Sequence, residues 1–105
     1  MPYIKEAARN AEIDDDFTLN ESIEDIIDYI QDLDDDQKEG TCNFIISRIV
    51  AGGMKPKTGW RYIWMSRAYC VFQAAGAEFY RRLLGKYEDE AILKNGDIPE
   101  YMADD

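Results

Sequence analysis

Apolar residues recur at helical spacing along most of the chain, and the longest such run lies between Gly59 and Leu84. Two apolar stripes follow one predicted helix there, and a helix that is apolar on two sides is typically buried between neighbours. We therefore expect the helix 59–84 to form the centre of the fold. The first stripe, called the seam, should face partner helices and consists of Tyr62, Met65, Tyr69, Phe72, Gly76, Phe79 and Leu83. The second stripe consists of Trp60, Trp64, Ala68, Val71 and Ala75.

The same periodicity, with its start and stop signals, predicts helices on both sides of this central one. They are a short N-terminal helix at 1–13, main helices at 19–33 and 37–51, and a short helix at 87–95 before a tail at 97–105. Thr18 and Glu21 match a Thr-x-x-Glu capping box, whereas Gly52, Gly53 and Gly85 are expected to end or interrupt helices. Sustained alternation of period two is missing. The prediction is an all-α fold, a small bundle of three main helices plus short terminal helices in a single domain.

Charge is divided along the chain, which carries a formal net charge of −10. Residues 1–40 hold three Lys/Arg against 14 Asp/Glu, residues 41–86 eight against one, and residues 87–105 one against seven. Either the acidic flanks fold back and neutralise the basic centre, or the centre keeps a positive site for an anion. Because no long apolar run or signal-peptide pattern is present, we expect a cytoplasmic protein without membrane contact.

The residue types present exclude several kinds of catalysis. The sequence contains no histidine, the commonest general base and transition-metal ligand. Glycine-rich phosphate loops are also missing. The Asp triplets 14–16 and 34–36 lack EF-hand spacing, and each precedes a helix, where carboxylates are favoured by the helix dipole. We therefore predict a protein that is not an enzyme and has no cofactor or metal; a carboxylate and metal enzyme is the least supported alternative.

The EFYRR segment, residues 78–82, is the first candidate site. Arginine binds phosphate in a forked geometry and tyrosine can stack on a base, so a nucleotide or cyclic-nucleotide site is one interpretation. Its binding groups would be Tyr80, Arg81, Arg82, Lys86 and Tyr87. The alternative is an ordinary ion pair, because Glu78 precedes the two arginines by three and four residues.

The acidic side of the helix predicted at 19–33 is the second candidate. Its carboxylates, together with one from the next helix, are Glu24, Asp25, Asp28, Asp32 and Asp35. Such a surface can mimic nucleic acid and occupy a basic site on a host defence or DNA-processing protein. Direct DNA binding is disfavoured, because the net negative charge repels the phosphate backbone.

Three stretches of the chain resemble a small family of uncharacterised bacterial and bacteriophage proteins. They are the opening MPYIK, the central CNFIISRIV and the closing EFYRRLLGKYEDEAILKNGDI. Members of that family begin with MPYI and carry EFYRR, YED and NGD near the C-terminus. The resemblance implies a helical fold and a phage or prophage setting, and it supplies no activity. Together, these features predict a phage-encoded, non-enzymatic binding or inhibitor protein that occupies a host protein, with the nucleotide sponge as the alternative.

The second stripe also bears on assembly. The other helices of one chain can cover one stripe of the central helix, so the second needs a further cover. A homo-oligomer, with a dimer favoured, would supply it by pairing central helices. The competing interpretation is that the segment near Tyr3 and Ile4 and the tail near Ile98 and Tyr101 wrap onto this stripe within one chain.

Overall fold

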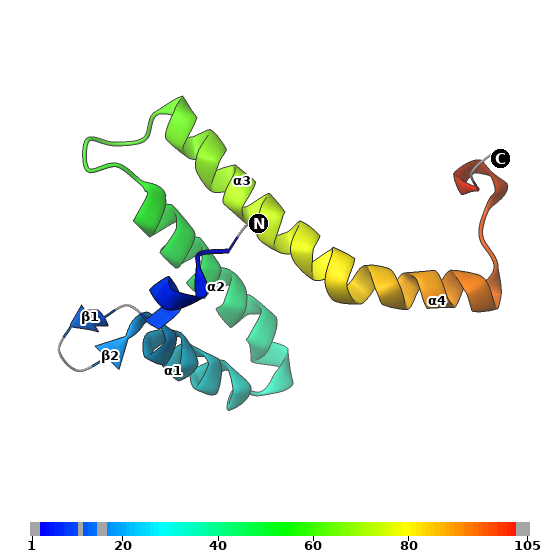
Figure 1. Cartoon of the computed structure of the whole chain (residues 1–105), viewed down its shortest axis with the longest axis horizontal. Helices are drawn as coiled ribbons and strands as arrows, with labels where there is room; N and C mark the ends of the chain where they lie inside the picture. The colour runs from blue at the N-terminus through cyan, green and yellow to red at the C-terminus, as the bar shows by residue number, and fades with distance from the viewer. Residues whose placement is uncertain (1–2, 11, 15–16, 103–105) are drawn as a thin grey trace. The chain divides into compact units, whose positions relative to one another are not determined.

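The structure is a computed structural model that describes residues 3–10, 12–14 and 17–102 of the chain. Its helices confirm the predicted helical class (Figure 1). Where the sequence predicted one domain, the chain divides into two compact units, residues 1–68 and 69–105. The boundary falls inside the helix α3 (Tyr62–Phe79).

The first unit begins with short elements where the sequence predicted a helix at 1–13. A 3-10 helix, η1, spans Glu6–Asn10, and the strands β1 (Glu12–Asp14) and β2 (Phe17–Thr18) follow it. The strands pair antiparallel, with Glu12 opposite Thr18 and an irregular register beside it. Strands of two or three residues are too short to show an alternating pattern, so periodicity could not predict this hairpin. Residues 1, 2 and 11 of the predicted helix lie outside the described residues.

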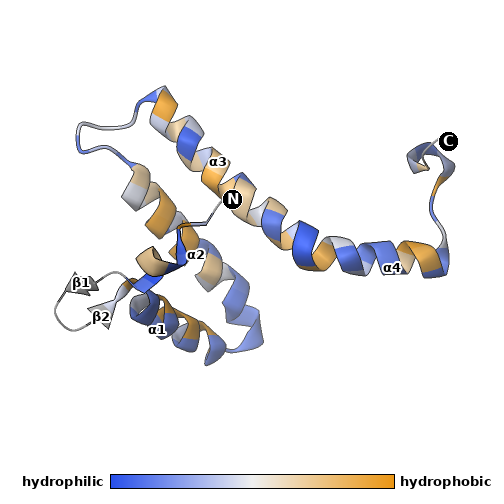
Figure 2. Cartoon of the chain, viewed as in Figure 1, coloured by the Kyte–Doolittle hydropathy of each residue, from blue (hydrophilic) through white to orange (hydrophobic). Residues whose placement is uncertain are grey.

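Helix α1 (Leu19–Gln31) forms as the sequence predicted, because its start is capped and one of its sides is apolar. The backbone N–H of Glu21 donates to Thr18 Oγ1 over 3.2 Å, which confirms the N-cap. The helix contacts η1, β2 and α2. Its apolar side chains Leu19, Ile26 and Ile30 are half-buried, and Figure 2 shows the apolar and polar sides of this helix in different colours.

Helix α2 (Asp35–Met54) is longer at both ends than the helix predicted at 37–51. The prediction that Gly52 and Gly53 end it is wrong, since both lie in its last turns. A glycine costs a helix roughly 1 kcal/mol relative to alanine, which is too little to force an end. The helix ends at Lys55, whose N–H donates to Ala51 O over 3.0 Å and whose backbone is extended, as expected before Pro56.

The second unit is one helical rod with a short 3-10 turn after it. The C-terminal part of α3 continues into the π-helix η2 (Tyr80–Leu84) and then into α4 (Gly85–Asn95), and η3 (Pro99–Tyr101) follows. The interruption predicted at Gly85 takes the form of the π-turn η2 directly before it, through which the helix continues into α4. The predicted stop at Asn95 and Gly96 is confirmed, and Gly96 has a φ of 94°.

Gly85 allows the helix to hold one extra residue in this turn. Its N–H donates to Tyr80 O, five residues earlier, as in a π-turn. A Cβ at this position would lie 2.8 Å from Tyr80 O and 3.2 Å from Tyr80 Cε1. The tight turn around Tyr80 therefore requires glycine at position 85.

Burial on α3 differs from the prediction. The seam, expected to face partner helices, is exposed: Tyr62 is 82% exposed and Phe79 62%. The second stripe is covered at Trp64, which is half-buried, and at Ala68, which is 6% exposed, whereas Val71 is 43% exposed. Ala68 is the single buried side chain in the part of the chain that the structure describes. Both stripes look equally apolar in sequence, so periodicity could not tell which one the chain covers.

Candidate functional site

The EFYRR segment forms the ion pair that was the alternative to a ligand site. Arg81 Nη2 and Arg82 Nε both donate to Glu78 Oε1 over 2.5 Å. The Glu78 side chain is only 14% exposed, and the hydrogen bond from Arg81, followed by that from Arg82, lowers its pKa below the usual value. Each guanidinium therefore already has a carboxylate partner, and a phosphate would have to displace it.

Tyr80 is also held by a carboxylate. Its hydroxyl donates to Glu88 Oε2 over 2.5 Å, so the bond links η2 to α4 across the π-turn. This hydrogen bond, with the charge of Glu88, raises the pKa of the Tyr80 hydroxyl. Base stacking by Tyr80 stays a prediction; in the structure its hydroxyl bonds to Glu88 and its ring lies beside Gly85 in the π-turn.

The remaining predicted ligand groups lie on α4. Lys86 and Tyr87 are exposed. Tyr87 lines a shallow depression of about 260 Å³ together with Glu90, Ala91, Lys94 and Asn95. Tyr80, the two arginines and Tyr87 thus belong to three separate groups of contacts, and the structure does not gather them around one depression.

The acidic side of α1 is open to solvent. Glu24, Asp25, Asp28 and Asp32 are all exposed, and no ion pair of theirs is found within the described residues. Asp35, which begins α2, lies 3.6 Å from Lys38 Nζ. Steps of three or four residues place Glu24, Asp28 and Asp32 on one side of the helix, opposite the apolar side that contacts η1 and α2.

An uncharged, exposed stretch of α3 was missed as a surface. The sequence has no charged residue between Arg67 and Glu78, and every residue from 69 to 77 is exposed. This stretch carries Tyr69 and Phe72 of the seam, which are 62% and 37% exposed. The signal was present, since ten residues without a charge offer no polar side to face water.

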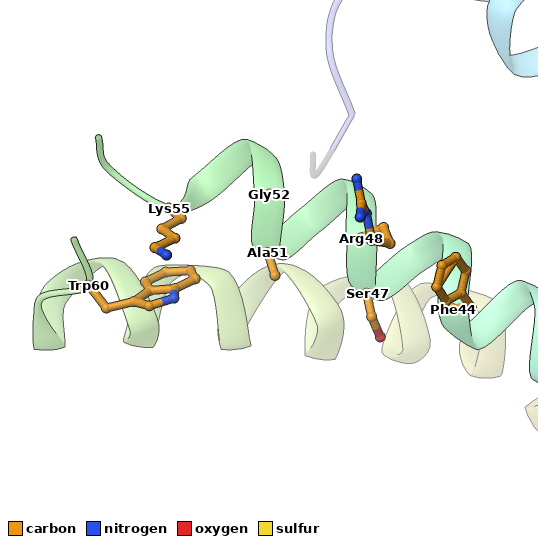
Figure 3. Close-up of a pocket in the computed structure, with 7 residues that line it drawn as sticks. All are labelled: Phe44, Ser47, Arg48, Ala51, Gly52, Lys55 and Trp60. Carbon is orange, nitrogen blue, oxygen red and sulfur yellow. The ribbon is translucent and has the colours of Figure 1, made fainter. Parts of the chain in front are cut away.

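A groove along one side of α2 was also missed. It has a volume of about 440 Å³ and is lined by Phe44, Ser47, Arg48, Ala51, Gly52, Lys55 and Trp60 (Figure 3). Trp60 comes from the loop before α3, and the others come from α2 and its C-cap. The signal in the sequence was the spacing of Phe44, Arg48 and Lys55 along one side of a helix, interrupted by glycine.

One protein family matches residues 1–98 of the chain, and it is described as a domain of unknown function (DUF6899). The chain belongs to this family. The predicted resemblance to a family without assigned activity is thereby confirmed, whereas a bacterial or phage origin stays a prediction. No curated protein and no solved structure matches the chain. DUF6899 membership brings no assigned activity with it.

The described residues lack two kinds of feature, a metal-binding cluster and a membrane-spanning helix. Among them, no three His, Cys, Asp or Glu side chains are grouped closely enough to hold a metal ion. Their helices include none that combines the length and the apolar character needed to cross a membrane.

Proposed function

We propose that this DUF6899 protein is a non-enzymatic binding protein that self-associates through the seam and presents the acidic side of α1 to a basic protein surface. The proposal is carried by the exposed, uncharged stretch of α3. The second unit is a single rod, and a single rod cannot bury two sides of itself. Another chain has to cover this stretch.

The exposed apolar area of the seam is large enough for a weak dimer. Tyr69 and Phe79 are each 62% exposed and Phe72 is 37% exposed. Since an aromatic side chain has roughly 150–250 Å² of surface, these rings leave on the order of 300 Å² open to water. With Leu83 on both copies, pairing would bury on the order of 800 Å², which is below the ~1,000 Å² that marks the lower limit of specific interfaces. The expected dimer is therefore weak and forms with rising concentration.

The order of residues along the seam favours a second copy as the cover. Phe72 and Phe79 lie on either side of Gly76, and Tyr69 and Leu83 lie beyond them. A two-fold axis at Gly76 would place Phe72 of one copy beside Phe79 of the other in an antiparallel pair. Nothing lies within 4 Å of the Cβ position of Gly76, so a second helix has room to approach there. Such isologous pairing is the commonest form of closed assembly.

The acidic side of α1 gives the proposed partner its chemistry. Its exposed carboxylates repel one another, and a basic protein surface would relieve that repulsion and be steered toward it. A dimer would carry two such sides. The partner is therefore expected to be a protein with a basic site, such as one that binds nucleic acid.

Sedimentation across a range of concentrations tests self-association. The wild-type mass should rise from that of one chain toward that of two, and Phe72→Asp should weaken the dimer at least about 100-fold, as for a residue central to an interface. Ala74→Asp is the matched control, because it adds the same charge to the opposite side of α3 and should leave the dimer intact. A mass of one chain at every concentration would refute the pairing.

Capture of partners from a host lysate tests the acidic side. A partner should bind at low salt, be released at high salt, and be lost when Asp28 and Asp32 are both replaced by Asn. Glu90→Gln with Glu100→Gln removes as much charge elsewhere and should retain the partner. If both double variants retain it equally, the α1 side is not the binding surface.

The nucleotide sponge is the second candidate, and its requirement is now specific. Arg81 and Arg82 would have to leave Glu78 for a phosphate. Calorimetry against a panel of nucleotides and cyclic nucleotides decides it. Binding that disappears in Arg81→Ala and Arg82→Ala would favour the sponge over the binding protein.

A further inference from the structure

We propose that the groove along α2 binds an acidic polypeptide segment with apolar side chains, and that its occupant is the C-terminal segment, Asp97–Met102, of a second copy. This inference is separate from pairing through the seam, because it uses other residues in both units. It concerns the α2 groove shown in Figure 3.

The groove combines an apolar floor with two positive charges. Phe44 lies near one end and Trp60 at the other, with Ala51 between them (Figure 3). Arg48 and Lys55 line it, both are exposed, and neither forms an ion pair with any described residue. From Phe44 to Lys55 the helix rises roughly 16 Å, at 1.5 Å per residue. A ligand should therefore be elongated, partly apolar and negatively charged.

Gly52 supports close approach by another backbone. Glycine is unfavourable inside a helix relative to alanine, so its place in α2 needs a reason that the first unit does not supply. Nothing lies within 4 Å of its Cβ position. The open space above Gly52 lies inside the groove, between Arg48 and Lys55 in sequence, so a bound chain can come close to the helix there.

The open form of the groove favours a polypeptide over a small molecule. Sites for small molecules enclose most of the ligand surface, about 70–90% of it. This groove is widely open to solvent along the helix. An elongated segment that lays apolar side chains on the floor and carboxylates beside the cations needs no such enclosure.

The C-terminal segment has the complementary features. Ile98, Tyr101 and Met102 are 50%, 80% and 62% exposed, so its own unit leaves them uncovered. The Tyr101 N–H donates to Ile98 O over 3.2 Å, and this turn of three residues puts the two side chains on the same side. Asp97 and Glu100 have the same spacing and supply two charges for Arg48 and Lys55. With this turn kept, six residues rise roughly 12 Å at about 2 Å each, which covers the part of the groove between Arg48 and Lys55.

The test uses the fluorescence of Trp60 and a peptide of residues 96–102. The receptor is the full chain with Trp64→Phe, so that Trp60 reports alone, and with Phe72→Asp and Tyr101→Ala, which remove seam pairing and competition from its own segment. The peptide should change Trp60 emission and saturate. Arg48→Glu or Lys55→Glu should weaken binding at least about tenfold, as expected for a charge facing the ligand. Lys57→Glu, in the neighbouring loop and outside the groove lining, is the matched control and should change binding less than about twofold.

Three results would overturn the proposal. The first is a scrambled peptide of the same composition that binds equally well, and the second is equal weakening by Lys57→Glu; either would reduce the effect to general charge attraction. The third concerns the second copy. In the Trp64→Phe chain with Tyr101 intact, Trp60 emission should change with protein concentration, and Tyr101→Ala should abolish that change. Emission that stays constant, or a change that survives Tyr101→Ala, would overturn the proposal. Calorimetry with the same peptide on the Tyr101→Ala chain repeats the test without replacing Trp64. Loss of seam pairing alone would leave all these expectations in place.

Discussion

Helix α1 and the C-terminal half of α3 are both rich in apolar residues, yet only α1 packs its apolar side against other elements of its own unit. The apolar side of α1 lies against η1 and α2, and its carboxylates lie on the other side. The stretch of α3 from residue 69 to 77 has no charged side to turn toward water, and all of it is exposed. A helix with one apolar side can be satisfied within its own unit, whereas a helix without a polar side needs a cover from outside its own rod.

Charged substitutions on the two helices should separate these cases most strongly. Ile26→Asp puts a carboxylate on the covered side of α1 and should destabilise the first unit by about 2–3 kcal/mol. Phe79→Asp, on the exposed seam, should cost the isolated chain less than about 1 kcal/mol. Urea unfolding at a concentration below that of dimer formation measures both.

The same pair of variants can break the comparison. If Phe79→Asp is as costly as Ile26→Asp at every protein concentration, the seam is covered within one chain. An equal cost that appears only at high concentration would instead report the loss of a partner copy.

Gly85→Ala should have an intermediate effect on stability, and it should destabilise the helix where a glycine-to-alanine change usually stabilises one. Alanine normally stabilises a helix relative to glycine, but a Cβ at Gly85 would lie 2.8 Å from Tyr80 O. We expect a loss of about 1–2 kcal/mol in thermal unfolding followed by circular dichroism, from strain at the π-turn. A gain in stability would contradict the requirement for glycine there.

Gly76→Ala is the matched substitution in the same rod, and its effect should depend on concentration. Nothing lies near the Cβ position of Gly76, so in the single chain alanine should stabilise by about 1 kcal/mol. Close packing of two seams would remove that gain at high concentration. A gain that persists in the dimer would move the two-fold axis away from Gly76.

The smallest expected effect is the loss of helix stability when Glu78 is protonated at low pH. Because the pKa of Glu78 is lowered by Arg81 and Arg82, its ion pairs stabilise the folded rod above the ordinary pKa of a glutamate. That contribution is lost as the pH falls through the lowered pKa. Helix content followed from about pH 6 to about pH 2 should therefore differ between wild type and Glu78→Gln at the upper end and converge at the lower end. Glu100→Gln serves as the control and should follow wild type.

The helices were predictable from sequence where local signals agree. Thr18 caps α1 as the capping box indicated, and Asn95–Gly96 ends α4. The errors arose where one local signal had to be weighed against another. Helix α2 continues through Gly52 and Gly53, which were expected to end it. At Gly85 the helix continues through a π-turn that no short-range pattern specifies.

The candidate sites were predictable only in part, for a related reason. The spacing of Glu78, Arg81 and Arg82 predicted their ion pair, which depends on neighbours within one helical turn. The groove depends on Trp60 reaching residues of α2 that lie up to 16 positions earlier, and single-sequence periodicity carries no information about such distances. The same limit explains the seam, whose exposure depends on elements far from it in the sequence.

The π-turn also resets which residues continue the seam beyond Leu83. In an uninterrupted α-helix, Lys86, Glu90 and Lys94 would share the angular position of Phe72 and Phe79, and three charges would end the apolar surface. One additional residue in the turn shifts every later position back by about 100°. Leu84, Tyr87 and Ala91 then come into phase, and the charged residues rotate away. Deleting a single residue between 80 and 84 would remove the turn and leave Tyr87 and Ala91 in phase, because the chain would then hold no extra residue to absorb. Closing the turn into α-helix at full length would instead put the charges back in line, so the length of the apolar surface depends on one additional amino acid.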